Sequence, residues 1–477
     1  MPRLRMISLL VALLLVAVAC GQKPGVHVAS SNGGVLAGQS SNTDTGSADV
    51  GASTDAGSAT ASGGATSSGG TSSGGTTTGG SKSGATKSGT SGGTSAASGP
   101  VKPTGHDRTG VSTDKITLAL HAPVTGAAPL PVTAFEKERD LFWRYLTEVK
   151  HEKVLGRSQV EVQFQDDKYQ PGTAVQACRE LGASSFLVVG GGGTDQIQAC
   201  GRYAESAHIP YLSAGVTETG LTGLQWYYSL SMSYKQQGKL LAQYVAKNFA
   251  GKKVAAVITD TPNFDDAVAG WEAGVKAAGL NYYKTLRHPK SDTSWYNTFA
   301  NELQSNKVDV VYILTAPVDY IRFAQQANGQ GYKPQFVGVG ISMGLNAVLG
   351  SGCPNVDGGI FFSPFPGLDW AKANLPDYFA AAQHAGISDP DDLGVALWGL
   401  AQSQYEMFKR YGATYGNDLT REDFRKLVET QANLHTGVFP DQSYTPSSHF
   451  GSNQVHVLKA DCSVKQYKTL ATFATGF

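Results

Sequence analysis

The chain has 477 residues, with 38 Lys or Arg against 38 Asp or Glu, and 41% of its residues are hydrophobic. The charge is balanced and no run of basic residues follows the N-terminus, so the sequence argues against nucleic acid as a partner. The part after the first hundred residues is longer than a typical single-core domain, and we expect it to form two lobes.

The first twenty residues are typical of an export signal that ends in a lipid attachment site. Two arginines precede the apolar run Met6–Val18, which leads through small residues to Cys20. This run is shorter than the roughly 20 residues that a membrane-spanning helix needs. The segment resembles the bacterial lipobox, although Ala17 stands where Leu is usual. We predict a lipoprotein signal peptide at residues 1–20 with lipidation at Cys20; plain secretion is the alternative.

Residues 21–106 are dominated by Gly, Ser, Thr and Ala, with very few large apolar side chains. A segment of this composition cannot bury a hydrophobic core and behaves as a flexible coil. About eighty such residues have an r.m.s. span of roughly 50 Å. The sequence therefore predicts a tether, which places the following domain outside the cytoplasm on a lipid anchor in the cell membrane.

Cysteine usage fits an exported protein. Of the five cysteines, four remain once the lipidation site is set aside, and an even number suits disulfides. Four cysteines allow three pairings, of which we favour Cys178 with Cys200 and Cys353 with Cys462 because each pair falls within one expected lobe. There is no CxxC pair and no HExxH motif, and the histidines are scattered. We therefore predict no metal site.

The remaining sequence alternates short β-branched runs with longer stretches of helical period, which predicts an α/β fold with parallel sheets. The expected strands are Ile116–Leu120, Val160–Phe164, Phe186–Val189, Val254–Thr259, Val308–Leu314 and Phe336–Val339. The expected helices are Thr133–Val149, Thr173–Leu181, Lys235–Phe249, Asp265–Ala278 and Ser294–Gln304.

Several segments, in order, resemble the leucine/isoleucine/valine-binding protein family of ABC importer receptors. They include KITLALHAPVTG, FLVVGGGGTDQIQACGRYAESAHIPYLSAG, YKQQGKLLAQYVAKNFAGKKVAAVITD, WEAGVKAAGLN, DTSWYNTFANELQSNKVDVVYI and ANGQGYKPQFVG. The similarity extends from Asp114 to about Leu470. It implies a type I periplasmic binding fold: two Rossmann-like lobes joined by three hinge crossovers, near Tyr228–Tyr234, Gly359–Pro364 and Phe439–Phe450.

The resemblance also sets the expected domains and function. Lobe one would comprise residues 107–230 and 360–440, and lobe two residues 231–359 and 441–477. Such a protein is a lipid-anchored solute-binding protein, not an enzyme. It closes around a small molecule and delivers it to the permease subunits of an ABC importer. A sensor subunit that reports its ligand to a membrane receptor is an alternative with the same fold.

Ligands of open α/β sheets bind beyond the carboxyl ends of the strands, so the loops there carry our candidate site. The candidates in lobe one are Thr125, Thr194, Asp195, Gly215 and Thr217, and those in lobe two are Phe264, Pro317 and Ser342. The resemblance implies that the Gly215 N–H and the Thr217 hydroxyl bind a ligand carboxylate. It also implies that the aromatic ring of Phe264 covers the bound side chain. The glycine run at 190–193 lacks the spacing of a dinucleotide fingerprint, so we expect no cofactor.

The sequence departs from the family at the position that pairs with an amino-acid ammonium group. The family has an acidic residue there, whereas this chain has Gly340. It also lacks the usual Tyr near residues 315–317 and the usual Ser near Asp195. An unpaired buried ammonium costs several kcal/mol. A free branched-chain amino acid is therefore disfavoured unless Asp195 or Asp319 replaces the missing acid, and we expect a different small molecule, neutral or aromatic.

One motif favours an enzyme instead. Residues Gly340–Gly344 read GxSxG after an expected strand, as in the nucleophile elbow of a serine hydrolase. Such an enzyme would need Asp391 or Asp392 and His435 or His449 near Ser342. The short, glycine-rich segment that follows the motif argues against this exported serine hydrolase.

Overall fold

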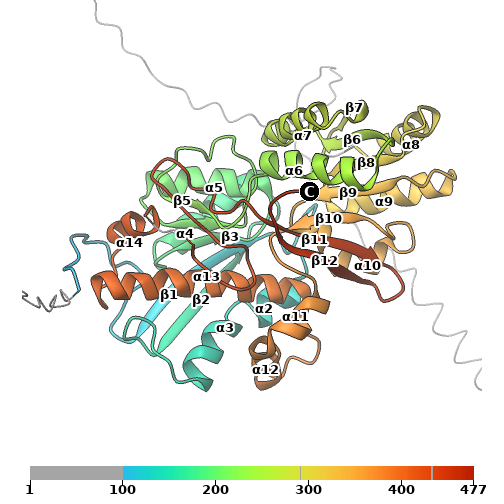
Figure 1. Ribbon diagram of the computed structural model, residues 1–477. Helices are drawn as coiled ribbons and strands as arrows, with labels where there is room; N and C mark the ends of the chain where they lie inside the picture. The colour runs from blue at the N-terminus through green and yellow to red at the C-terminus, as the bar shows by residue number, and fades with distance from the viewer. Residues whose placement is uncertain (1–99, 291, 431–432) are drawn as a thin grey trace, which may run out of the picture. The chain divides into compact units, whose positions relative to one another are not determined.

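The computed structural model describes residues 100–290, 292–430 and 433–477. Within them the chain forms two α/β lobes, each built on its own sheet (Figure 1). The predicted signal peptide, the lipidation site Cys20 and most of the predicted tether lie outside the described residues. No helix in the described part combines the length and the hydropathy needed to cross a membrane.

The sheet of lobe one has five strands, and every neighbouring pair is parallel. In spatial order these are β2 (Gln159–Asp166), β1 (Lys115–Ala122), β3 (Val188–Gly190), β4 (Tyr211–Ser213) and β5 (Tyr227–Ser229). Successive residues of β1 point to opposite faces, so Leu118 and Leu120 enter one apolar core and Ala119 enters another. Helices must therefore cover both faces.

Two groups of helices provide this cover. Helices α4 (Pro171–Gly182) and α5 (Thr194–Ser206) pack over the core that contains Ala119. The other, larger core is covered by α2 (Val132–Lys137), α3 (Leu141–Arg144), α11 (Leu368–Asn374), α12 (Pro376–His384), α13 (Asp392–Tyr415) and α14 (Arg421–Val428). Trp398 and Phe408 of α13 are buried there, as their helical spacing indicates.

The sheet of lobe two has seven strands. Their spatial order is β12 (Gln466–Ala474), β11 (Val455–Asp461), β10 (Ile360–Ser363), β9 (Gln335–Val339), β8 (Val310–Leu314), β6 (Lys253–Thr259) and β7 (Asn281–His288). Only the pairs made by β11 are antiparallel. One face packs against α6 (Tyr234–Asn248) and α7 (Asp265–Ala277), and the other against α8 (Trp295–Ser305), α9 (Pro317–Gly329) and α10 (Asn346–Gly352).

The chain passes between the lobes three times: from β5 to α6, from β10 to α11, and from α14 to β11. The first and third crossovers lie side by side. The Ser229 N–H donates to the His449 carbonyl at 2.8 Å, and the Gly451 N–H donates to the Ser229 carbonyl at 2.9 Å. The predicted fold class, two Rossmann-like lobes joined by three crossovers, is confirmed.

Both disulfides follow the pairing favoured from the sequence. Cys178 joins Cys200 between α4 and α5 of lobe one, and Cys353 joins Cys462 in lobe two, with Cα–Cα distances of 5.9 and 5.5 Å. Each bridge therefore reinforces one lobe and leaves the crossovers between lobes unconstrained.

Three sequence expectations change in detail. Strand β10 belongs to the second sheet, so the crossover begins after Ser363 and not at residue 360. The folded domain starts before the expected boundary at 107, because the backbone N–H groups of Thr104 and Gly105 donate to Asp423 of α14. The single helix expected over 133–149 is interrupted at Glu138, where φ reaches −117° and the side chain turns into the core.

Glu138 is a buried acid at the contact between α2 and α12. Tyr378 Oη donates a hydrogen bond to its Oε2 atom at 2.6 Å. Burial is the main cause that raises the pKa of Glu138 from 4.5 to about 7, and the nearby Asp391 and Asp389 carboxyls also raise it. The folded protein therefore retains a proton that the unfolded chain releases at lower pH.

We predict that the free energy of unfolding falls as the pH rises from 4.5 to 7, because the folded state binds more protons in that window. The loss attributable to Glu138 between pH 5 and 8 should be about 2–3 kcal/mol. Urea unfolding of Glu138→Gln should show a correspondingly smaller decline. The exposed neighbour variant Glu136→Gln should retain the full decline, and equal slopes in the two variants would refute the assignment.

Candidate functional site

A cavity lies between the lobes, at the carboxyl ends of parallel strands from both sheets. Lobe one contributes Pro123 after β1, Tyr169 after β2, residues 190–194 after β3, and Ala214 after β4. Lobe two contributes Phe264 after β6, Leu314–Pro317 after β8, and Val339–Met343 after β9. This is where open α/β sheets place their ligands.

The cavity is narrow and predominantly apolar. The volume open to the centre of a water molecule is about 70 Å³. Among the described residues, no Asp, Glu, Lys, Arg or His lines it; its polar side chains are the hydroxyls of Tyr169, Thr194, Tyr234, Thr315 and Ser342. A ligand with two opposite charges would find no ion-pair partner in this lining.

Four predicted residues line this cavity: Thr194, Phe264, Pro317 and Ser342. Thr194 and Pro317 begin α5 and α9, and neither helix has a side-chain cap at its N-terminus. The N–H groups of a first helical turn have no acceptor within the helix. Helix α5 therefore presents a full first turn of N–H groups at the cavity wall. In α9 the first residue, Pro317, has no N–H. The Asp319 N–H donates to the Ala316 carbonyl at 3.0 Å, so this end offers the Val318 N–H. Both ends favour an acceptor or anionic group.

Thr125 is not part of the cavity lining. Its hydroxyl donates to Asp166, which also accepts the backbone N–H groups of Val124 at 3.0 Å and Lys168 at 2.9 Å. Asp166 thus fastens the loop after β1 to the loop after β2. Lys168 and Tyr169 have φ values of 56° and 58° in the same loop, and Tyr169 reaches the cavity.

Tyr234 lies next to Gly340, the position where the resemblance led us to expect an acid. Gly340 has a φ of 100°, and a Cβ atom there would lie 2.9 Å from Tyr234 Oη. Burial raises the pKa of Tyr234 to about 12, with a hydrogen bond to Thr194 acting in the opposite sense. A neutral phenol packed on Phe264, with ring centroids 6.0 Å apart, therefore stands where a carboxylate is expected for an amino-acid ligand.

Neither acid that could replace the missing one lines the cavity. Asp319 accepts a hydrogen bond from Tyr296 Oη at 2.5 Å. Asp195 pairs with Lys290 of lobe two and accepts from the side chains of Asn263 and Thr261, the latter at 3.4 Å. Asp195, only 15% exposed, thus bridges the two lobes next to the cavity instead of pointing into it.

A second bridge between the lobes involves Thr217, another predicted ligand residue. Its hydroxyl donates to Asp266 Oδ2 of α7 at 3.0 Å, and the Glu218 N–H donates to the same atom. Gly215 also lies outside the lining: its φ is 81°, and a Cβ would meet Ser231 Oγ at 2.5 Å. Its neighbours Ala214 and Val216 reach the cavity in its place.

Among the described residues, no hydrogen bond joins Ser342 to a candidate partner of a hydrolase nucleophile. His435 Nδ1 hydrogen bonds Asp441 at 2.7 Å, and His449 Nδ1 donates to the Tyr227 carbonyl at 2.9 Å. Asp391 caps α13 through the Gly394 N–H, and Asp392 accepts from the Asn346 N–H. The four candidate triad partners are therefore engaged elsewhere.

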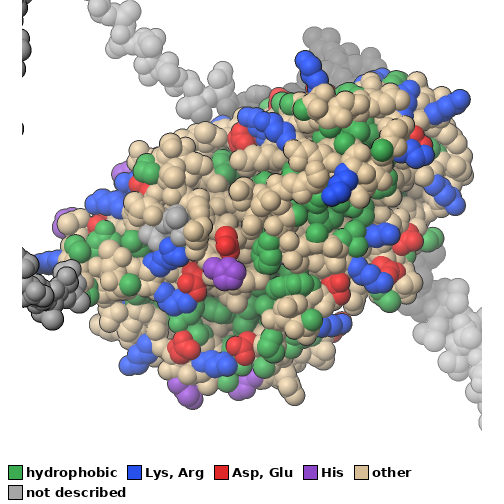
Figure 2. Space-filling view, in the orientation of Figure 1, with side chains coloured by type: hydrophobic (Ala, Val, Ile, Leu, Met, Phe, Trp, Pro, Cys, Tyr) green, Lys and Arg blue, Asp and Glu red, His purple; other side chains and the backbone are tan. Residues whose placement is uncertain are grey.

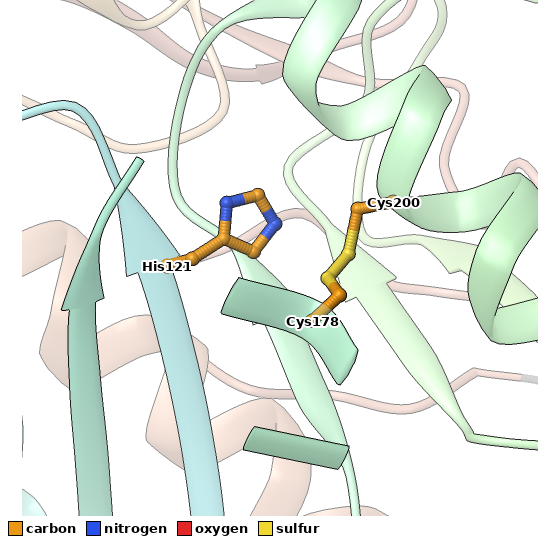
Figure 3. Close-up of side chains that lie close together, drawn as sticks. All are labelled: His121, Cys178 and Cys200. Atoms are coloured by element: carbon orange, nitrogen blue, oxygen red, sulfur yellow. A yellow bond between two sulfur atoms is a disulfide. The ribbon is translucent and has the colours of Figure 1, made fainter. Parts of the chain in front are cut away.

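His121 lies beside the Cys178–Cys200 disulfide in the core of lobe one (Figure 3), with one ring nitrogen within 4.8 Å of both sulfur atoms. The two sulfurs are bonded to each other. The ring nitrogens of His121 hydrogen bond Asp167 and Tyr211 Oη, both at 2.8 Å. The trio of side chains is therefore a packed structural contact in which the donor atoms are already used.

Sequence reasoning missed Tyr169 and Tyr234. Tyr169 follows the expected strand Val160–Phe164 within five residues, so its place beyond a strand end was a usable signal. Tyr234 begins a helix after a crossover, and no feature of the sequence pattern indicates that its side chain lines the cavity.

Comparisons with known proteins agree with this geometry. Residues 115–466 match the family model described as periplasmic binding protein. Leu/Ile/Val-binding protein homolog 8 of Brucella abortus is 29% identical over 265 residues, which cover 52% of this chain and 59% of that protein. The match thus spans about three fifths of the length of these curated relatives.

Solved structures share the fold at low identity. The substrate-binding protein of a fatty acid ABC transporter from Thermomonospora curvata has a TM-score of 0.66 and 18% identity, covering 78% of this chain and 95% of that one. A Rhodopseudomonas palustris solute-binding protein in complex with benzoate has a TM-score of 0.61 and 16% identity, covering 76% and 96%.

The two lobes and the cavity between them define a type I solute-binding protein. The chain belongs to the periplasmic binding protein family, and the resemblance to leucine/isoleucine/valine-binding proteins is confirmed. This family comprises extracytoplasmic receptors for small ligands and not enzymes.

We predict that Asp195→Ala shifts the protein toward a more open arrangement of its lobes, because Lys290 and Asn263 lose their partner across the cleft. Small-angle scattering should give a larger radius of gyration for this variant than for the parent chain. Ligand affinity should fall about tenfold if the bridge contributes about 1.4 kcal/mol to closure. The control is Asp292→Ala, at a partly buried carboxylate that accepts hydrogen bonds from Ser294 of the same lobe, and it should match the parent. An unchanged radius for Asp195→Ala would contradict the prediction.

Proposed function

We propose that the protein is a lipid-anchored, extracytoplasmic receptor of an ABC importer. It would capture a small, mostly apolar molecule with one carboxylate or carbonyl end. The observation that carries this proposal is the cavity between the lobes, whose lining is apolar and contains no charged side chain among the described residues.

The polar end of such a ligand fits the N-terminal end of α5, and the Val318 N–H of α9 is a further donor from lobe two. Helix N-termini attract carboxylates through unpaired N–H groups and the helix dipole. The hydroxyls of Thr194 and Ser342 lie in the same lining and can add hydrogen bonds. The apolar body would contact Phe264, Leu314 and Val339 on the side of lobe two.

A free branched-chain amino acid fits poorly. Its ammonium group would be desolvated against Tyr234, whose hydroxyl stays neutral because burial raises its pKa to about 12. Leaving a charge unpaired in such a site costs several kcal/mol. The fold neighbours that belong to a fatty acid transporter or bind benzoate are compatible with this choice of ligand class.

The role in import rests on the family and on the anchor predicted from the sequence. Closure around a ligand that contacts both lobes gives a permease a distinct form to recognise. Uptake assays separate an importer from a sensor: cells lacking the gene should lose accumulation of the labelled ligand, and the wild-type gene should restore it. Normal accumulation without the gene would favour the sensor.

We predict that calorimetric titration gives micromolar binding of benzoate or a short aliphatic carboxylate, and none of leucine, isoleucine or valine. Phe264→Ala should weaken the carboxylate by about tenfold, since it removes roughly 1–2 kcal/mol of apolar contact. Phe379→Ala, at a half-buried aromatic residue on α12, is the matched control and should bind as the parent does. Micromolar leucine binding would refute the ligand class.

A further inference from the structure

A second hollow adjoins the cavity between the lobes. One wall is the loop Ala127–Pro131 of lobe one, and the other is formed by α9 and α10 of lobe two. The volume open to the centre of a water molecule is about 430 Å³, against about 70 Å³ for the cavity itself. We call this hollow the side groove.

The side groove and the cavity share part of their lining. Ala128, Leu130, Pro317 and Ser342 line both of them. Pro317 and Ser342 belong to lobe two and the other two residues to lobe one, so the passage between the spaces runs along the line where the lobes meet. The side chains of these four residues are therefore all that the shared lining shows between the two spaces, and a ligand tail would pass along them.

The walls of the side groove are apolar along most of their length. Pro129 and Pro131 face it from one side, and Ile321, Ala347 and Val348 from the other. Val318 of α9 also lines it and is 37% exposed, one of few large hydrophobic side chains that the described surface leaves open. Polar side chains of Arg322, Gln325 and Ser351 also contribute to the lining.

Figure 2 shows hydrophobic side chains in several patches on one face of the molecule, so exposed apolar groups by themselves do not identify a site. On the face seen in Figure 2, Lys and Arg are interspersed with Asp and Glu among the other side chains. The side groove differs from a single exposed hydrophobic side chain, because it is largely apolar and lies next to the cavity where we expect the ligand to bind.

We propose that the side groove holds the apolar chain of an elongated ligand whose carboxylate end occupies the cavity. This inference rests on the proposed function and narrows it from small apolar carboxylates to those with a linear tail. The cavity alone is too narrow for such a molecule, and the side groove provides the remaining volume. Because both lobes form the side groove, the tail would also contribute to holding them together.

The test is a calorimetric titration of the full-length chain with unbranched carboxylates from pentanoate to decanoate. Affinity should rise about fourfold per added methylene until the side groove is filled, the factor that corresponds to about 0.8 kcal/mol per buried CH₂. Val318→Asp, which places a charge on the wall, should reduce the ratio of decanoate to pentanoate affinity at least tenfold. Val464→Asp changes another exposed valine of lobe two, 55% exposed, and should leave that ratio unchanged.

Ala347→Trp provides a second, uncharged variant. It fills the side groove from an exposed position of α10 and should also lower the ratio, whereas Ala277→Trp on α7 should not. If pentanoate binds but longer acids gain nothing, or if both pairs of variants give equal ratios, the assignment of the side groove is wrong while the proposed function stands. If no carboxylate of any length binds, the proposed function fails and this inference fails with it.

Discussion

The strands of a parallel sheet all have their carboxyl ends at one edge, so the loops that follow them lie together. In this protein two such edges, one from each lobe, face each other. The glycine run after β3, the Thr315–Pro317 turn after β8 and the Val339–Met343 segment after β9 meet at one cavity for this reason. The glycine run is followed by α5, whose first N–H groups lack partners within the helix, and the turn after β8 is followed by the Val318 N–H of α9. The arrangement therefore concentrates hydrogen-bond donors at the cleft without placing a charged side chain there.

Charged residues act around the cavity and not within it. Asp195 with Lys290 and Asp266 with Thr217 join the lobes beside the ligand space. An ammonium group for Asp195 and hydrogen-bond donors for Asp266 offset part of the cost of burial. These bridges are separate from the residues that line the cavity. We therefore expect the polar contacts between the lobes to set the balance between open and closed forms, and the shape and apolar area of the cavity to set ligand selectivity. Tyr234 belongs to the lining of the cavity. It packs against Phe264 and occupies the space next to Gly340.

The two disulfides leave this mechanism intact because each lies inside one lobe. Cys178–Cys200 joins α4 to α5, and Cys353–Cys462 ties the end of α10 to the turn between β11 and β12. The three crossovers remain the only covalent connections between lobes in the described part of the chain. Rigid lobes and hinges without a cross-link are the mechanical condition for capture by closure.

The sequence by itself determined the class of fold, favoured the observed cysteine pairing among three, and placed four residues of the cavity among its eight candidates. Periodicity locates strands and helices, and the rule that loops follow strands identifies Thr194, Phe264, Pro317 and Ser342. It could not determine that Asp195 and Thr217 bridge the lobes, because their partners Lys290 and Asp266 lie about 95 and 49 residues away. Nor could it indicate that Tyr234 excludes a side chain at Gly340, or that the loop Ala127–Pro131 meets α9 and α10. These contacts depend on how two separately folded sheets face each other, and only the tertiary structure decides that.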